Sequence, residues 1–486
     1  MLQFWLAVSF VVVVTFVHTL ALPLLITYDG MEYAHLANVL SGPAVIAHWN
    51  FYRTPLFPLT LDLSFWLGGE QQQSALLVTT LFGVAGMLLV GFTVRKLAGG
   101  TAAAVALILL AFYPTLIAYE HTLLSETGIF FCFALLEWSL VCLVPGSNRF
   151  ILLSCWTALV ITLGYYWRPT ILYFSPLVAV VFLLLVLGSS AIRPSERLRR
   201  LWSADPRVLA SALIIAALPW LLAHPWQQLT EEHAPNTYEG FLAEGMFKEV
   251  LVPPDDPILA SVRAEYQTAI EHDLRNGHLP LDGVTIGYHD ALINRVIQAL
   301  HAAGIRKQIV RYPVRYLVRI VKCTIFFMGV PDHRVDDENW WFAYYVFGLS
   351  PPGEALDKAL GWDTKLIQFA PPPSGGAHLG TFVKALMPLY VWIVLASSIV
   401  SVGWLAFSIK MLDPVGLTLT SIPFALMVLH SLPLMAADRY AFPVYPLILA
   451  NLVLITRSLI LLLRKRSLLT PAPSLDSTRQ VPHSFL

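Results

Sequence analysis

Apolar runs long enough to cross a lipid bilayer recur along this chain, and they constrain its fold more than any other feature. A helix needs about 17 to 25 mostly apolar residues to cross the hydrocarbon core. Backbone groups in lipid must find partners within the protein, so runs of this length predict helices. Of the 486 residues, 57% are hydrophobic and 13% are charged, and that charged share is about half that of a soluble domain. We therefore predict an all-α polytopic membrane protein.

The distribution of arginine and lysine predicts how the spans are oriented, because these residues gather on the cytoplasmic side. With a cytoplasmic N-terminus, the basic groups within 95–96, 193–200 and 464–466 all fall inside. We therefore expect both termini on the cytoplasmic side of a plasma (inner) membrane. The chain has no Asn-x-Ser/Thr acceptor, which favours a bacterial membrane over a glycosylating secretory route. The predicted spans, about ten in all, are 3–27, 74–94, 102–119, 124–144, 151–167, 170–188, 208–225, 382–409, 414–436 and 440–463.

The other segments complete a division of the chain into four regions. Residues 311–330 place Arg311, Arg315, Arg319 and Lys322 beside an apolar face, which predicts a basic amphipathic helix lying in the membrane interface. The end of the chain is rich in Pro and Ser and predicts disorder. The predicted regions are an N-terminal transmembrane module at 1–225 with a first outer loop at 28–73, a mostly helical extracytoplasmic loop domain at 226–381, a C-terminal transmembrane module at 382–466 and a cytoplasmic tail at 467–486.

The stretch YDGMEYAHLANVL, residues 28–40, places two acids, Asp29 and Glu32, directly after the first predicted span. One interpretation is a capping box, in which Asp29 caps a helix and Glu32 reaches back to the helix start. A second interpretation takes in another acid, Glu126, at the outer end of a later span. Ionisable groups at the edge of the hydrocarbon are unfavourable unless they are paired or used. Acids gathered on one face therefore indicate a functional site.

Three arginines, Arg53, Arg168 and Arg439, reach the same outer boundary on different segments. A guanidinium group can bond two phosphate oxygens at once through its planar fork. We therefore predict a cavity that binds an anionic group where lipid meets water. The alternatives are that Arg168 extends to the lipid headgroups and that Arg439 pairs with its neighbour Asp438.

Five short motifs carry a resemblance to a known family. They are YDGMEYAHLA, YRTPLFPL, LLSET, WRPT and ADRYAFPVYPLIL. In their order along the chain, and in their shared position on one predicted face of the membrane, these motifs resemble the GT-C superfamily of polyprenyl-phosphate-sugar-dependent glycosyltransferases. The resemblance is nearest to the protein-mannosyltransferase and aminoarabinose-transferase branch. The resemblance covers roughly residues 1–190 and 382–463. It implies a GT-C-like transmembrane helix bundle that moves a sugar from a polyprenyl-phosphate donor to a lipid, glycan or protein acceptor on the extracytoplasmic face.

The resemblance also implies roles for individual residues. Asp29 matches the catalytic acid of the first outer loop, and Glu126 matches the second acid. Arg53 matches a basic residue before the paired prolines, and Arg439-Tyr440 matches a terminal Arg-Tyr motif. The candidate catalytic residues are therefore Asp29, Glu126 and Glu32. The candidate substrate-binding residues are Arg53, Arg168, Arg439 and Tyr440.

One departure from the family leaves a role open. In parts of the family the first-loop acid is followed at once by another acid, whereas Gly30 follows here and the next acid is Glu32. The division of labour between Asp29 and Glu32 therefore stays open. The chemistry needs a carboxylate base for the acceptor hydroxyl and fixed cations for the departing phosphate. Attack opposite that phosphate would invert the anomeric centre.

Cofactors and rival functions remain to be weighed. No His pair has metal-ligand spacing, and the only candidate cofactor is a divalent ion, Mg or Mn, bridging Asp29 and Glu126. No nucleic acid is expected as a partner. The rivals are a transporter or lipid-linked glycan flippase, a polysaccharide ligase or polymerase, and a receptor using 226–381. A transporter fits less well, because the chain lacks repeated halves and paired interrupted helices.

The predicted orientation can be tested by labelling introduced cysteines in intact cells. Asn236→Cys should react with a membrane-impermeant thiol reagent, because it follows the predicted span 208–225 on the outer side. Thr470→Cys should react only after the cells are opened. Labelling of Thr470→Cys from outside would contradict the predicted topology.

Overall fold

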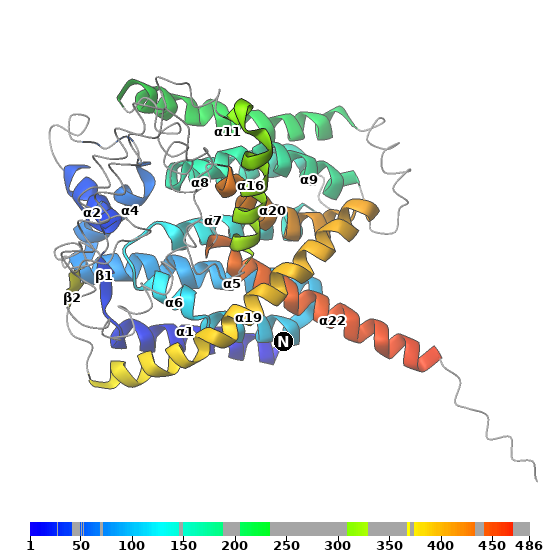
Figure 1. Cartoon of the computed structure of the whole chain (residues 1–486), viewed down its shortest axis with the longest axis horizontal. Coiled ribbons are helices and arrows are strands. Elements are labelled where there is room, and N and C mark those ends of the chain that lie inside the picture. The colour runs from blue at the N-terminus through cyan, green and yellow to red at the C-terminus, as the bar shows by residue number, and fades with distance from the viewer. Residues whose placement is uncertain are drawn as a thin grey trace, which may run out of the picture.

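The computed structural model describes residues 1–26, 28–40, 49, 51, 53–68, 71–144, 149–187, 205–233, 309–328, 367–369, 374–432 and 442–469. Within these ranges, nine helices are long and apolar enough to cross a membrane. The prediction of an all-α polytopic membrane protein is therefore confirmed. Figure 1 shows the long helices packed side by side, with the short elements that precede and follow Asp29 gathered at one end of the bundle.

The bundle is built mainly from helices of one to two dozen residues or more. Two segments continue or precede them: the π-helix η1 (Ser139–Leu143) follows α7, and the 3-10 helix η2 (Pro169–Phe174) precedes α9. The helices that form the membrane-length segments, α7 together with η1 and α9 together with η2, are α1 (Leu2–Ala21), α5 (Gln71–Ala111), α7 (Glu126–Trp138), α8 (Phe150–Trp167), α9 (Ser175–Leu187), α11 (Pro206–His233), α19 (Ser374–Met411), α20 (Pro414–Ser431) and α22 (Tyr445–Leu469). The other helices are α2 (Tyr28–Leu40), α4 (Leu56–Gly68), α6 (Pro114–Glu120), α16 (Pro313–Phe327) and the 3-10 helix η3 (Phe442–Val444).

Helix α5 contains a reversal of direction at Gly99. Gly99 has φ +81, a backbone conformation that glycine adopts without a Cβ penalty. A Cβ added at Gly91 would lie 2.8 Å from the Leu107 side chain, so the two arms of α5 run antiparallel against each other. The predicted spans 74–94 and 102–119 occupy these arms, with α6 extending the second. Counting the arms separately reconciles the nine helices with the ten predicted spans.

The first predicted span ends earlier than expected. Helix α1 stops at Ala21, and Leu22 adopts an extended conformation with φ −108 and ψ 146. Pro23 follows, and the residue before a proline is biased against the helical region. The chain then forms β1 (Leu24–Ile26), which pairs antiparallel with β2 (Ile367–Phe369). The prediction of a span to residue 27 is therefore wrong at its last residues.

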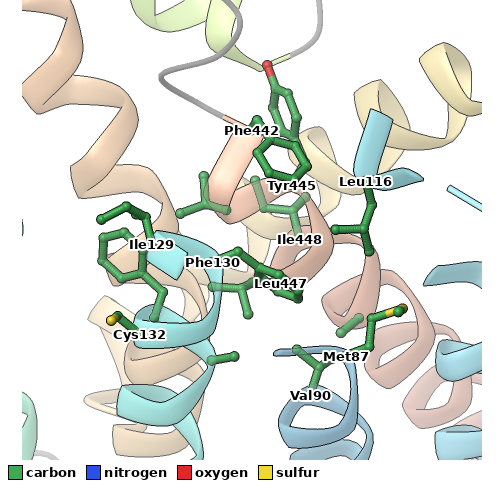
Figure 2. Packing of buried hydrophobic residues seen from close by; sticks show 14 of the residues in the cluster. Met87, Val90, Leu116, Ile129, Phe130, Cys132, Phe442, Tyr445, Leu447 and Ile448 are labelled. Carbon is green, nitrogen blue, oxygen red and sulfur yellow. The ribbon is translucent and has the colours of Figure 1, made fainter. Parts of the chain in front are cut away.

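Residues from both ends of the chain share one buried core. Figure 2 shows Met87 of α5, Phe130 of α7 and Leu447 of α22 meeting in it. Lipid tails are as apolar as leucine, so membrane helices associate through close packing and interhelical hydrogen bonds. Both occur here. A Cβ at Gly86 would lie 2.5 Å from the Phe130 ring, and the Asn451 side-chain amide donates to the Leu419 carbonyl at 2.8 Å.

Within the segment 311–330, predicted as an interfacial helix, residues Pro313–Phe327 form the helix α16. It packs on the end of α20, where the Tyr316 hydroxyl donates to the Leu432 carbonyl at 2.8 Å. Val314 and Leu317 on another face are exposed. Apart from 226–233, 309–328, 367–369 and 374–381, the predicted loop domain lies outside the described residues, as does the predicted tail beyond Leu469.

The close approach of Gly128 to Trp167 predicts a stability loss. A Cβ on Gly128 of α7 would overlap the Trp167 indole ring, so Gly128→Ala should lower the free energy of unfolding by about 1–3 kcal/mol through overpacking. Gly403→Ala is the matched control, because nothing lies within 4 Å of its added Cβ. Denaturant unfolding of the purified protein in detergent micelles measures both. Equal stability of the two variants would contradict this packing.

Candidate active site

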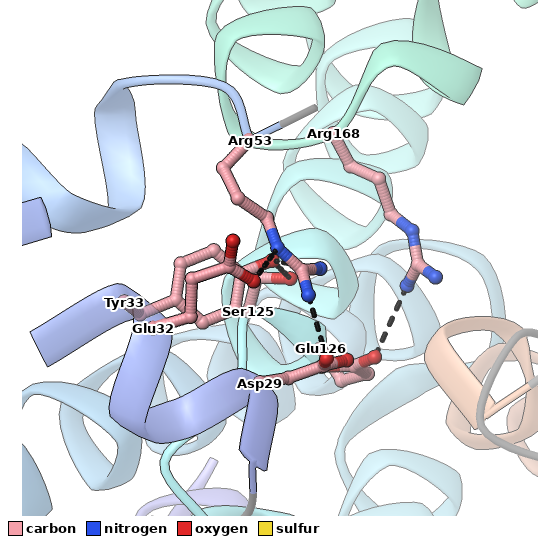
Figure 3. A network of polar contacts seen from close by, with 7 residues as sticks. All are labelled: Asp29, Glu32, Tyr33, Arg53, Ser125, Glu126 and Arg168. Carbon is pink, nitrogen blue, oxygen red and sulfur yellow. Dashed lines mark hydrogen bonds and ion pairs between the residues drawn. The ribbon is translucent and has the colours of Figure 1, made fainter. Parts of the chain in front are cut away.

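The candidate site lies where the starts of two helices and two connecting segments meet at one end of the bundle. Asp29 and Glu32 belong to the first turns of α2, and Glu126 is the first residue of α7. Arg53 lies shortly before α4, and Arg168 joins α8 to η2. Figure 3 shows both guanidinium groups pointing toward these carboxylates. The structure thus brings together five of the predicted site residues, while Arg439 and Tyr440 lie outside the described residues.

Arg53 is held by both acids of the first outer loop. Its Nη2 lies 2.6 Å from Asp29 Oδ1, and its Nε lies 2.8 Å from Glu32 Oε2. Residues three apart lie on the same face of a helix, so the spacing of the two acids suits a single guanidinium. Helix α2 begins at Tyr28, so Asp29 lies within the first turn and not before it. Both acids therefore pair with Arg53.

Tyr33 completes the surroundings of Arg53. The guanidinium carbon lies 4.9 Å from the centre of the Tyr33 ring, in range of a cation–π contact, and Nη1 donates to the Tyr33 hydroxyl at 3.4 Å. Burial raises the pKa of the Tyr33 phenol, which keeps it neutral. Burial also works to lower the pKa of Arg53, but the negative groups around it outweigh burial and raise that pKa. Arg53 is therefore a permanent cation.

Arg53 and its two acids are also accessible. The side chains of Arg53, Asp29 and Glu32 are 23%, 19% and 21% exposed. A ligand that arrives at this end of the bundle can therefore reach the cation and both carboxylates. The site combines a fixed positive charge with two accessible proton acceptors.

The second ion pair is more deeply buried. Arg168 Nη1 lies 3.2 Å from Glu126 Oε1, and the Glu126 side chain is only 4% exposed. Within the described residues, Glu126 Oε2 is buried and has no hydrogen-bond partner. A buried acceptor without a partner is unfavourable. Oε2 is therefore suited to accept a hydrogen bond from a ligand hydroxyl.

A set of neutral hydrogen bonds fixes the segments that carry these charges. The Trp167 indole donates to the Ser125 carbonyl at 2.8 Å, and the Thr54 hydroxyl donates to the Trp167 carbonyl at 2.9 Å. The Trp49 indole donates to the Arg53 carbonyl at 3.0 Å. The segments before α4, α7 and η2 are thus tied to one another. Sequence reasoning missed these residues, although Trp167 begins the WRPT motif.

The carboxylates present do not form a metal cradle. Within the described parts of the chain, no group of three or more His, Cys, Asp or Glu side chains is arranged to hold a metal ion. Asp29 and Glu126, the expected bridging pair, each face an arginine. Because Arg53 and Arg168 already lie against these two carboxylates, a metal ion there would be repelled by two positive charges. We derive no step through Mg or Mn.

Comparison with known proteins returns three distant structures. ArnT from Cupriavidus metallidurans bound to undecaprenyl phosphate is 16% identical, with a TM-score of 0.38, over 93% of this chain and 77% of that chain. The same protein in its apo state gives 14% identity and a TM-score of 0.37 over the same shares. The archaeal oligosaccharyltransferase AglB from Archaeoglobus fulgidus, in complex with an inhibitory peptide and a dolichol-phosphate, is 11% identical. Its TM-score is 0.46, over 96% of this chain and 52% of that one.

No family model matches the chain, and no curated protein matches it. The chain spans about half the length of AglB. Similarity this distant carries no argument about the activity of this chain, so the function is argued from its own residues.

The Glu126–Arg168 pair predicts a coupled effect on stability. Arg168→Gln should leave a buried carboxylate without its cation and lower the free energy of unfolding by about 2–3 kcal/mol, toward the lower end for a broken buried pair. The double variant Glu126→Gln with Arg168→Gln should recover most of that loss, because no buried charge remains. Unfolding in detergent micelles measures the series. Additive losses would show that the two side chains do not interact.

Proposed function

We propose that this protein is an integral-membrane glycosyltransferase that moves a sugar from a polyprenyl-phosphate donor to a hydroxyl acceptor. The observation that carries the proposal is the accessible Arg53 clamped by Asp29 and Glu32 beside the buried Glu126–Arg168 pair. An arginine for phosphate and a carboxylate for a hydroxyl proton are the two groups that this transfer needs. Their place at one end of a membrane bundle suits a donor whose lipid tail stays in the bilayer.

Arg53 and Arg168 would bind the donor phosphate. Both are partly exposed, at 23% and 17% of the side chain, and each guanidinium has five N–H donors in a fixed fork. Negative charge builds on the phosphate as it leaves, so a fixed cation stabilises the transition state more than the ground state. Arg439 and Tyr440 are proposed to complete this phosphate site.

Asp29 would act as the general base. The acceptor oxygen attacks C1 of the sugar as the bond from C1 to the phosphate oxygen breaks. The acceptor proton passes to Asp29, and the phosphate leaves with the bonding electron pair. Attack from the opposite side inverts the anomeric centre. Glu32 would hold the Arg53 guanidinium group in position, because it accepts from Nε while Asp29 accepts from Nη2.

Glu126 would orient the hydroxyl that reacts or a hydroxyl of the sugar. Its Oε1 faces Arg168, and the unpartnered Oε2 is an acceptor for such a group. The acceptor class remains lipid, glycan or protein. The proposed setting is the extracytoplasmic face of a bacterial plasma membrane, which places the reaction in the cell envelope.

The geometry favours transfer over transport. Every described Arg–carboxylate pair lies at the end of the bundle that contains α2. A transporter places its charged binding groups near the bilayer midplane. A polysaccharide ligase or polymerase would use the same groups with a polymer as acceptor, and it differs from the proposal only in the substrate.

Exchange of each acid for its amide separates the roles of Asp29 and Glu32. Asp29→Asn should lower kcat by about a hundredfold or more, because a positioned base contributes that much. Glu32→Gln should be milder, because the amide oxygen still accepts from Arg53. Transfer is measured on purified protein with a defined polyprenyl-phosphate sugar, and unfolding serves as the control for integrity. Retained activity in Asp29→Asn together with loss in Glu32→Gln would reverse the assignment.

A further inference from the structure

A buried polar chain lies apart from the Arg53 and Arg168 pairs and has no part in the proposed reaction. It consists of Pro23, His18 near the end of α1, Glu120 at the end of α6, and His121. The three ionisable side chains come from residues that are 2%, 0% and 0% exposed. We call this group the His18–His121 chain. Four polar partners in an apolar interior indicate a defined role, because each is unfavourable there without a partner.

The distances fix the order of the chain. His121 Nδ1 lies 3.1 Å from the Pro23 carbonyl oxygen, and His121 Nε2 lies 2.9 Å from His18 Nδ1. His18 Nε2 lies 3.2 Å from Glu120 Oε2, close enough for an ion pair although the geometry is not that of a good hydrogen bond. Both nitrogens of both rings are therefore engaged.

Donor and acceptor rules then count the protons. A carbonyl oxygen only accepts, so His121 Nδ1 carries a proton. If both rings are neutral, His121 Nε2 accepts from His18 Nδ1, and His18 Nε2 is left as an acceptor facing Glu120. An uncompensated charge is unfavourable at a residue that is 0% exposed, so Glu120 then carries a proton. If a ring is charged instead, Glu120 is the matching carboxylate. Either way the group shares one acidic proton and has no net charge.

The chain holds the segment that leads to Asp29 against the turn that leads to Glu126. The His121 ring bonds the Pro23 carbonyl, and its own carbonyl accepts from the Leu25 N–H at 2.7 Å. The Leu123 N–H donates to the Leu25 carbonyl at 2.9 Å. These bonds fix Leu25 of β1, four residues before Asp29, on the turn that contains Leu123, three residues before Glu126.

A glycine contact on each side shows how tightly these parts fit. A Cβ at Gly30, next to Asp29, would lie 2.6 Å from the Leu123 carbonyl oxygen. A Cβ at Gly83 of α5 would lie 2.6 and 2.7 Å from the Cγ and Cδ atoms of Glu120. Neither position accepts a side chain without movement of its neighbour, so the carboxyl group of Glu120 and the start of α2 have little room to shift.

We propose that the His18–His121 chain is a positioning device that sets the distance between Asp29 and Glu126. It fixes the start of α2 and the start of α7 to one short turn, through the hydrogen bonds from His18 to His121 and from His121 to the Pro23 carbonyl. Glu120, His18 and His121 are positioning residues, because they contact neither substrate nor reacting atoms in the proposed mechanism. The inference about catalysis rests on the proposed transferase function. The inference that the His18–His121 chain holds β1 against residues 121–123, which we call the β1 clamp, does not rest on it.

The first test measures how firmly the β1 clamp holds, from the rate of amide hydrogen exchange in peptides that cover 22–26 and 121–124. Glu120→Ala should speed exchange there by about tenfold or more, because a buried partner is lost. Glu120→Gln should exchange as the wild type does, since its amide N–H donates to His18 Nε2. The matched control is Glu137→Ala, a second buried glutamate, on α7. Wild-type exchange in Glu120→Ala would overturn the proposal.

If Glu120→Ala does not fold, Gly83→Ala provides the same test without removing a polar group. Its methyl group should displace the Glu120 side chain and speed exchange of the same peptides. Alanine is otherwise favoured over glycine in a helix, so a general loosening of α5 is not expected. Wild-type exchange at 22–26 in a folded Gly83→Ala protein would count against the clamp.

The second test follows transfer. Glu120→Ala should lower kcat by about ten- to a hundredfold, with the donor KM within a few-fold of wild type, as expected from misplacement of a catalytic group. Glu120→Gln should recover it. Equal loss in both variants would show that the proton itself is needed and would overturn a positioning role. Absence of transfer by the wild type would instead contradict the proposed function, and the exchange data would still decide on the clamp.

Discussion

The organisation of the site depends on one guanidinium shared by two carboxylates. Arg53 would be unfavourable at the edge of the hydrocarbon without partners, and the same is true of Asp29 and Glu32. Their mutual bonds allow all three to lie partly exposed at one end of an apolar bundle. This arrangement links the turn of α2 that carries the acids, the segment before α4 and the Tyr33 ring.

The bundle supports this site through close backbone contacts instead of long apolar side chains. Gly99 reverses α5, Gly128 makes room for the Trp167 indole, and Gly83 makes room for Glu120. The Gly128 contact also brings a hydrogen bond within reach, because the Trp167 indole donates to the Ser125 carbonyl at 2.8 Å. In lipid, where apolar surface offers little driving force between helices, such pairs of small residues and hydrogen bonds are the means of association. The contact that packs α7 against Trp167 therefore also helps to position the segment that leads to Glu126.

The sequence was enough to predict most of the spans and five candidate residues that the structure brings together, because ionisable groups at the ends of apolar runs are rare and conspicuous. It was not enough for features that depend on distant pairing. The strand β1 continues an apolar run. Pro23 is a local sign that the helix ends there, but the extended pairing of β1 depends on β2, far along the chain. His18 and Glu120 each look like isolated polar residues, since their partnership spans more than a hundred positions. The role of Tyr33 depends on its contact with Arg53, which lies twenty positions further along the chain.

The pairing of β1 with β2 has a consequence for how the family of sequences related to this chain can vary. Leu24–Ile26 and Ile367–Phe369 are joined through backbone groups, and backbone pairing is indifferent to most side chains but not to proline. Residues 367–369 can therefore drift widely in identity while keeping an extended form. A large insert that diversifies between α11 and α19 would thus stay docked beside the strand that precedes Asp29.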